Sequence, residues 1–155
     1  MTFVERKHVK ENNIGEIKRM VFKNLIPIDD PIDLYSQHTL LHDAVIMNRV
    51  ELFDFLVTQG ANPMVRDQNG YTPLLKAAAL GRLYMVKKLI EGLHCDPRHV
   101  DPFGVTSREK AELYMRHEVS DYLREMEIKA KRGELKIKPH IEFQRSGRYR
   151  TRFNY

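Results

Sequence analysis

Apolar residues recur along the chain at helical spacing, in pairs of short segments. One such segment contains Leu74, Ala77 and Ala78, and the next contains Met85, Val86, Leu89 and Ile90. Pro73 suits the first turn of a helix, where its missing N–H costs nothing, and Thr72 precedes it as an N-cap. Gly81 separates the two segments and suits a helix end. The pattern predicts two short helices joined by a tight turn.

The same pattern returns with a nearly fixed period. One threonine occupies the same place in each of three successive copies, as Thr39, Thr72 and Thr106. The interval from Thr72 to Thr106 is one residue longer than the interval from Thr39 to Thr72. A turn sequence beginning with aspartate also repeats, at 67–70 and 101–104. We expect the extra position of the third copy to be an insertion at 93–97, opposite 60–63. A period of this length is typical of a repeat protein, so self-similarity decides the fold class.

The middle copy, DQNGYTPLLKAAALGRLYMVKKLIEG, resembles the ankyrin repeat, whose signature is a turn, then T-P-L-H-x-A and two antiparallel helices. The preceding copy reads TLLHDA, with Leu40 where the family has proline, and Leu75 replaces the usual histidine of the middle copy. The third copy departs more, because residues 107–110 replace P-L-H. Residues 14–21 resemble the end of a first helix and the second helix of a degenerate first copy.

The resemblance implies an all-α ankyrin-repeat solenoid of paired antiparallel helices with an extended C-terminal tail. We expect an ankyrin-repeat domain at 1–126 and a basic tail at 127–155. The units run at about 2–32, 33–66, 67–100 and 101–126, of which the first and last are degenerate caps. The expected continuous core is Leu41, Ala44, Leu52, Leu56, Leu74, Ala77, Met85, Leu89, Val119 and Leu123. His42, the family's usual histidine, should bond backbone between repeats, and Asp43 beside it should be exposed.

In ankyrin proteins the turns before each first helix project as fingers, and these fingers with the exposed first-helix faces bind other proteins. By position in the motif, the resemblance implies a protein-binding surface of Tyr35, Gln37, Arg66, Gln68, Tyr71, Lys76, Phe103 and Arg108. Tyrosine and arginine are frequent anchors of protein interfaces. An alternative for several of these residues is an ordinary solvated turn.

Charge changes the picture of the tail. The chain has 26 basic and 21 acidic residues and a net charge of +5. Nine basic and three acidic residues lie in 127–155, so the tail carries +6 and the repeat region −1. We expect tail contacts from Lys136, Lys138, Arg145, Arg148, Tyr149, Arg150, Arg152 and Phe153. Arginine interleaved with aromatic residues suits RNA, and the same composition suits an acidic protein groove. Residues 135–138 and 141–143 alternate like edge strands, so strand addition to a partner is a third alternative. A solvated, disordered tail that only aids solubility is the fourth.

Evidence for catalysis is weak in this sequence. It contains no phosphate-binding loop, dinucleotide fingerprint, H-E-x-x-H motif or nucleophile elbow. One polar cluster, His94, Cys95, Asp96 and His99, has residue types that can bind zinc, but it lacks the paired spacing of structural zinc sites. An insertion in a repeat turn is the simpler interpretation. We therefore expect a non-catalytic protein without a cofactor, a metal or a small-molecule substrate.

The remaining features bear on location. A single cysteine cannot form an internal disulfide, which favours an intracellular, reducing compartment. The opening segment 1–13 lacks the apolar stretch of a secretory signal, Glu5 and Glu11 argue against a mitochondrial presequence, and no apolar run is long enough for a membrane span. The sequence thus predicts an adaptor or structural subunit that docks in a larger protein assembly, most simply cytoplasmic, with a mitochondrial or ciliary assembly as alternatives. The competing hypothesis is an RNA- or ribonucleoprotein-associated protein whose tail contacts phosphates.

Overall fold

The fold was analysed in a computed structural model, which describes residues 7, 8 and 10–139. Its elements are α2 (Ile14–Phe22), α3 (Leu40–Ile46), α4 (Val50–Thr58), α5 (Pro73–Leu80), α6 (Leu83–Lys87), the π-helical turn η1 (Lys88–Gly92), α7 (Ser107–Leu113) and α8 (His117–Lys131). In the described part of the chain there is no strand, only an isolated bridge between Val100 and Thr106. The predicted all-α fold is confirmed.

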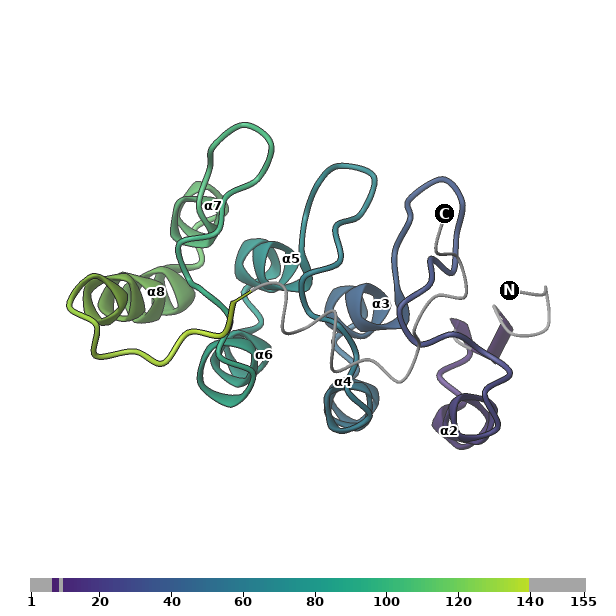
Figure 1. Cartoon of the computed structure of the whole chain (residues 1–155). Coiled ribbons are helices and arrows are strands. Elements are labelled where there is room, and N and C mark those ends of the chain that lie inside the picture. Colours follow the sequence, from purple (N-terminus) through teal and green to yellow (C-terminus); the bar gives the residue numbers. More distant parts are fainter. Residues whose placement is uncertain (1–6, 9, 140–155) are drawn as a thin grey trace, which may run out of the picture.

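Two rows of helices form the stack (Figure 1). Helices α3, α5 and α7 form the inner row, and a long loop, or finger, projects in front of each of them. Helices α2, α4 and α6 form the outer row with α8 at the end of the stack. Neighbouring units contact one another mainly through the inner helices, as in other solenoids.

Each inner helix begins at a threonine in the same position of the repeat. The side-chain oxygens of Thr39, Thr72 and Thr106 accept hydrogen bonds from the backbone N–H three residues later. These bonds satisfy a donor that a helix N-terminus would otherwise leave unpaired. The N-cap predicted at Thr72 is confirmed, and Pro73 occupies the first turn as expected.

The inner helices end with residues in the left-handed region, including Gly81 (φ 72°) and Met115 (φ 55°). The next residue is an arginine that reaches back to the preceding unit. Arg82 donates to the carbonyls of Val45 and Ile46, and Arg116 donates to the carbonyl of Ala79 at 3.2 Å. A helix C-terminus has unpaired carbonyls, so these arginines cap one helix while joining two units.

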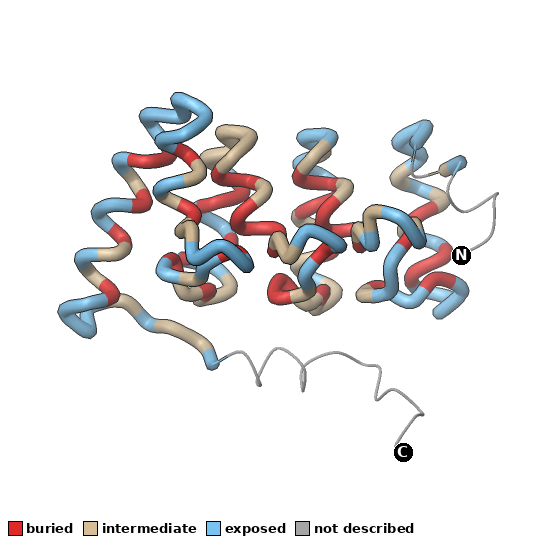
Figure 2. The backbone as a smooth tube through the Cα atoms, turned by 90° about the horizontal axis from the view of Figure 1, so that it is seen from above, coloured by how far each residue is buried: buried red, intermediate tan, exposed pale blue. Residues whose placement is uncertain are grey.

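The hydrophobic core runs between the two rows of helices (Figure 2). All ten residues predicted for the core are buried, none more than 3% exposed. The core also includes residues that the repeat pattern did not predict, namely Ile26, Ile28 and Ile32 in the segment between α2 and α3. Asp29 in this segment accepts the backbone N–H of Asn62 at 2.7 Å, so the segment joins the first unit to the exit turn of the next.

The extra residue of the third period lies in η1, so the predicted insertion at 93–97 is wrong. The exit turns match residue for residue: Asn62 and Asp96 each accept the N–H of the residue two positions later. Before the turn, the N–H of Ala61 bonds to Leu56, five residues back, whereas the N–H of Cys95 bonds to Leu89, six residues back. A π-helical turn accommodates one additional residue within a helix.

Helix α8 continues past residue 126, the expected start of the tail. Met126 and Ala130 are buried, and Leu135 packs against the core. The backbone N–H of Lys138 then donates to the carbonyl of His94 at 2.8 Å. Residues 127–138 therefore belong structurally to the stack, and the division of the chain at residue 126 passes through a helix.

Candidate protein-binding surface

Buried aspartates give the second and third fingers their shape. One carboxylate oxygen of Asp67 accepts the N–H groups of Asn69 and Tyr71, both at 2.9 Å. Asp101 repeats this arrangement in the third finger, with N–H donors at 2.8 and 2.9 Å from Phe103 and Val105. Such bonds fix the backbone of a turn, so the fingers present their tips in a defined orientation.

The second carboxylate oxygen of each aspartate holds a lysine of the inner helices. Lys76 Nζ lies 3.3 Å from Asp67, and Lys110 Nζ lies 2.8 Å from Asp101. Burial raises the pKa of the Asp101 carboxyl, but the hydrogen bonds from Lys110 and from two backbone N–H groups outweigh it and lower the pKa overall. Both aspartate side chains lie beneath the surface, with no exposed area of their own.

Tyr71 is the centre of this arrangement. Two cations approach its ring, with Lys76 Nζ 5.0 Å and Lys110 Nζ 4.8 Å from the ring centre, and its hydroxyl accepts a hydrogen bond from Lys110 at 3.1 Å. An ammonium over an aromatic face is attracted by the ring's negative quadrupole. The two lysines and the tyrosine thus restrain one another in one unit-to-unit contact.

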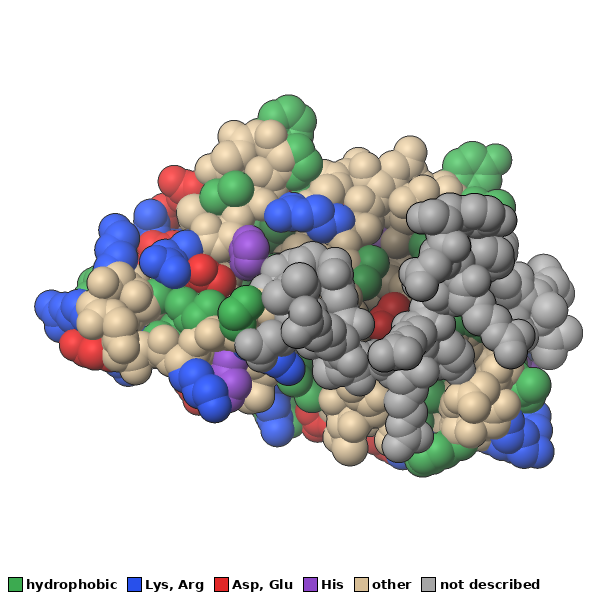
Figure 3. Space-filling model, in the orientation of Figure 1, with side chains coloured by type: hydrophobic (Ala, Val, Ile, Leu, Met, Phe, Trp, Pro, Cys, Tyr) green, Lys and Arg blue, Asp and Glu red, His purple; other side chains and the backbone are tan. Residues whose placement is uncertain are grey.

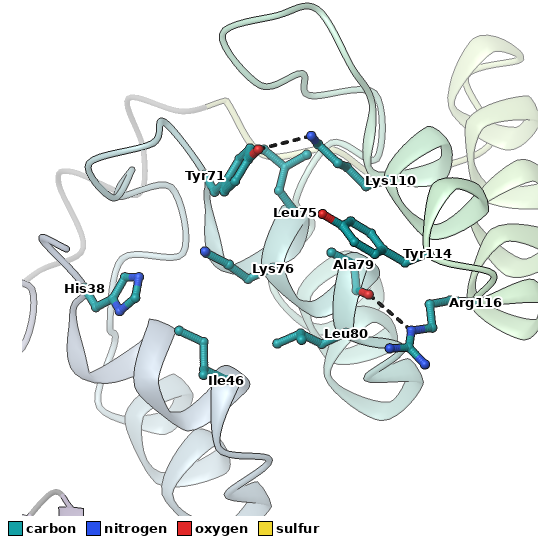
Figure 4. A pocket seen from close by; sticks show the side chains of 10 residues that line it. All are labelled: His38, Ile46, Tyr71, Leu75, Lys76, Ala79, Leu80, Lys110, Tyr114 and Arg116. Atoms are coloured by element: carbon teal, nitrogen blue, oxygen red, sulfur yellow. Dashed lines mark hydrogen bonds between the residues drawn. The ribbon is translucent and has the colours of Figure 1, made fainter.

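These residues form one wall of a groove of about 550 Å³ on the inner row of helices (Figure 4). Its lining residues are His38, Ile46, Tyr71, Leu75, Lys76, Ala79, Leu80, Lys110, Tyr114 and Arg116. Aliphatic and aromatic side chains mix with three cations, and none of the described lining residues is acidic. A concave, largely apolar site with a few placed polar groups is typical of binding sites.

Beside the groove, His42 links the first two fingers. Its Nε2 donates to the carbonyl of Tyr71 at 2.9 Å, and its Nδ1 accepts the N–H of Thr39 at 3.3 Å. Burial lowers the pKa of His42 to about 4, against the opposing effect of the bond to Tyr71, so the ring is neutral at pH 7. The predicted bond between repeats is confirmed.

The sequence model of the ankyrin-repeat family matches this chain in three copies, over residues 9–101 and 41–131. The matched region covers most of the chain. The protein belongs to the ankyrin-repeat family. Ankyrin repeats are generally protein-interaction modules.

Several curated proteins are similar to this ankyrin-repeat chain over part of its length. Glycerophosphocholine phosphodiesterase gde1 of Schizosaccharomyces pombe is 40% identical over 91 residues, which is 57% of this chain and 8% of that protein. Inactive serine/threonine-protein kinase TEX14 of Bos taurus is 32% identical over 85 residues (55% and 6%). The human 2-5A-dependent ribonuclease is 44% identical over 43 residues (28% and 6%). The chain therefore spans less than a tenth of these relatives.

The structure brings some of the predicted binding residues together and separates others. Tyr71 and Lys76 line the groove. Tyr35 and Phe103 lie in the first and third fingers, 85% and 84% exposed, and hydrophobic side chains stand out at two finger tips in Figure 3. Gln37 and Gln68 are also exposed on the fingers. These six residues are accessible to a partner.

The two predicted arginines have structural partners instead. Arg66 donates to the carbonyls of Gly70 and Val100, at 2.6 and 3.1 Å, and thereby joins two fingers. Arg108 forms ion pairs with Glu127 and Glu112, at 2.9 and 2.8 Å. A role for either arginine in binding stays a prediction.

Sequence reasoning predicted only Tyr71 and Lys76 among the residues that line the groove, and it missed the others, including Lys110, Tyr114 and Arg116. Lys110 is the counterpart of Lys76, at the equivalent position of the next unit. Applying the repeat register to every predicted residue would have found it. Asp43 was also predicted incorrectly: it is half-buried, not exposed, and lies 3.7 Å from His38 Nδ1.

Most of the predicted tail contacts cannot be located. Arg145, Arg148, Tyr149, Arg150, Arg152 and Phe153 lie outside the described residues. Lys136 is exposed, and Lys138 is half-buried beside the turn at His94. Within residues 7, 8 and 10–139, no helix is both long and apolar enough to cross a bilayer.

The polar turn at 94–99 does not assemble a metal site. Cys95 is 1% exposed, and burial raises its thiol pKa to about 12. Asp96 is occupied by an ion pair with Arg98 at 2.9 Å. Across the described residues, no three His, Cys, Asp or Glu side chains are grouped to hold a metal ion. Cys95 is instead the counterpart of the buried Ala61 in the previous unit.

Proposed function

We propose that this ankyrin-repeat protein is a non-catalytic adaptor or structural subunit that docks into a larger protein assembly. Ankyrin repeats are generally protein-interaction modules, and the groove supplies the surface for such an interaction. The observation that carries the proposal is the combination of apolar and aromatic side chains with fixed cations on a rigid concave face.

The exposed finger tips extend this surface beyond the groove. Phe103 and Tyr35 are large and almost fully solvent-exposed, although burying an aromatic side chain is favourable by roughly 25 cal/mol per Å². Rigid, exposed aromatic residues are frequent interface anchors, because little conformational entropy is lost when they bind. A partner that spans the fingers would bury both.

The absence of a catalytic role is supported by the chemistry of the candidate nucleophile. A thiol with a pKa of about 12 holds almost no thiolate at pH 7, and Cys95 is inaccessible. The phosphodiesterase and ribonuclease relatives match over 8% and 6% of their lengths, so their activities do not transfer to this chain.

The test is affinity purification of the tagged full chain from its native source. We expect stable partner proteins with the unmodified chain and loss of at least one partner with Tyr35→Ala/Phe103→Ala. Phe22→Ala is the matched control, because Phe22 is also aromatic and 64% exposed but lies on outer helix α2. Recovery of the free chain alone, or equal losses in control and test variants, would contradict the proposal.

A second candidate function, RNA binding by the tail, rests on the arginine and aromatic residues after Pro139. Removing 140–155 is the suitable truncation, because a cut at 126 would divide α8. If the tail binds phosphates, this truncation should abolish RNA binding and flatten its dependence on salt. An unmodified chain that shows no salt-dependent RNA binding would exclude this candidate.

A further inference from the structure

One position of the inner helices changes its charge along the stack. Asp43, Lys76 and Lys110 are equivalent residues of consecutive units. The groove lies toward the basic end, next to Arg116. Lys76 and Lys110 line the groove, whereas Asp43 is not among its lining residues and lies 3.7 Å from His38, so the charge that the groove presents at this position is positive.

We propose that the groove binds an acidic segment of a partner protein. An apolar or aromatic side chain of that segment packs on Ile46, Ala79 and Leu80, and a neighbouring carboxylate binds Arg116 and Lys110. This inference rests on the proposed function above and specifies the chemistry of the partner.

The lysines retain donors for such a carboxylate. An ammonium has three N–H donors. Lys76 forms an ion pair with Asp67, and Lys110 forms an ion pair with Asp101 and donates one hydrogen bond to the Tyr71 hydroxyl. Both aspartate side chains have no exposed surface, whereas the two lysine side chains are 20% and 12% exposed. A ligand therefore meets the cations, and the counter-charges lie behind them.

Arg116 is the most available cation of the groove. Its Nε donates to the Ala79 carbonyl at 3.2 Å, and no described carboxylate forms an ion pair with it. The two terminal nitrogens of the guanidinium are thus left for a ligand. A planar guanidinium binds a carboxylate through two parallel N–H bonds, which fixes the position and orientation of the ligand.

The apolar part of the groove supplies the anchor. Ile46, Ala79 and Leu80 are half-buried, and Tyr114 is 54% exposed. Figure 4 shows Ala79 and Tyr114 beside Arg116, with Ile46 on the opposite side of the groove near His38 and Lys76. A ligand that pairs an apolar group with an acid one or two residues away matches this layout. A uniformly charged polyanion would leave the apolar floor unused.

Substitutions at Ala79 test the proposal without removing a structural contact. Glu, Gln and Lys at this position are similar in length, and the Arg116 bond uses the backbone carbonyl, which all three keep. The probes are peptides enriched from a random phage-displayed library on the full chain, synthesised and measured by fluorescence polarisation. Thermal melting checks that each variant folds, and Phe22→Ala is the surface control.

We expect the enriched peptides to place Asp or Glu near an aromatic or aliphatic residue. These peptides should bind the Ala79→Lys variant most tightly, the Ala79→Gln variant less tightly and the Ala79→Glu variant most weakly. The affinities of the Lys and Glu variants should differ by about fivefold or more. Arg116→Gln should weaken binding in the same peptides, and Phe22→Ala should leave it unchanged.

Three outcomes overturn the inference. In the first, the selection yields no peptides that combine an acidic with an apolar residue. In the second, the peptides bind the Ala79→Glu and Ala79→Lys variants equally. In the third, the groove variants alter the binding of single-stranded RNA and not that of the peptides. The proposed function fails separately, when Tyr35→Ala/Phe103→Ala retains every partner. The two conclusions can therefore be told apart.

Discussion

The contact between the second and third fingers can be tested at Gly70. This residue has φ +78°, and a Cβ built on it would lie 2.2 Å from Pro102 Cγ and 2.7 Å from Pro102 Cδ. Gly70→Ala therefore adds a left-handed backbone cost of about 1–2 kcal/mol and an overpacking cost of about 1–3 kcal/mol. The expected loss is about 2–5 kcal/mol out of a typical stability of about 5–15 kcal/mol.

Gly104 provides the matched control at the equivalent position of the third finger. Its φ is +80°, and nothing lies within 4 Å of an added Cβ. Gly104→Ala thus carries the backbone cost without the clash. Urea unfolding followed by circular dichroism should show a larger loss for Gly70→Ala, by about 1–3 kcal/mol.

A double-mutant cycle separates the clash from other effects. Pro102→Ala removes the atoms that the new Cβ would meet, so it should restore part of the loss in Gly70→Ala, with a coupling of about 0.5–3 kcal/mol. Equal losses in Gly70→Ala and Gly104→Ala, or a coupling of zero, would refute the close packing of the two fingers.

Three further predictions concern single residues. Because burial lowers the pKa of His42 from 6.5 to about 4, its stabilising effect is complete above pH 6.5 and is lost as the pH falls toward 4, by up to about 3 kcal/mol. Urea unfolding between pH 7 and 4 measures this loss, and a His42 ring that titrates near 6.5 by NMR contradicts it. Met115 is 77% exposed and has φ 55°, so Met115→Gly should raise the free energy of unfolding by about 1 kcal/mol, measured by urea unfolding. A loss of stability would show that the backbone is not strained at this position. Cys95 should react with a thiol reagent at pH 8 only on unfolding, since its thiol pKa is about 12, and rapid modification of the folded chain would disprove its burial.

The sequence contained enough information for the helices and the core. Repeated threonines at 39, 72 and 106 define where the inner helices begin, and apolar spacing defines what they bury. The place of the insertion was not predictable in this way. Leu89 and Ile90 are both apolar, so an extra residue after them in η1 leaves the buried face intact and the pattern unchanged.

The binding surface was predictable only in part, because position in a motif does not reveal what a charged side chain bonds. Arg66 and Arg108 occupy motif positions that face outward, yet backbone carbonyls and two glutamates hold them. Conversely, Lys110 and Arg116 become part of the groove only when the third unit stacks on the second. Such contacts between units depend on packing, which a period in the sequence does not specify.

Site-specific photo-crosslinking from position 79 tests most directly whether the groove is a protein-binding surface. A benzophenone amino acid replaces Ala79 in the groove or, as the control, Ile128, which is 44% exposed on α8. Illumination in the native source should join position 79, but not position 128, to a protein that also co-purifies with the unmodified chain. Crosslinks from position 128 alone, or from neither position while partners still co-purify, would contradict binding in the groove.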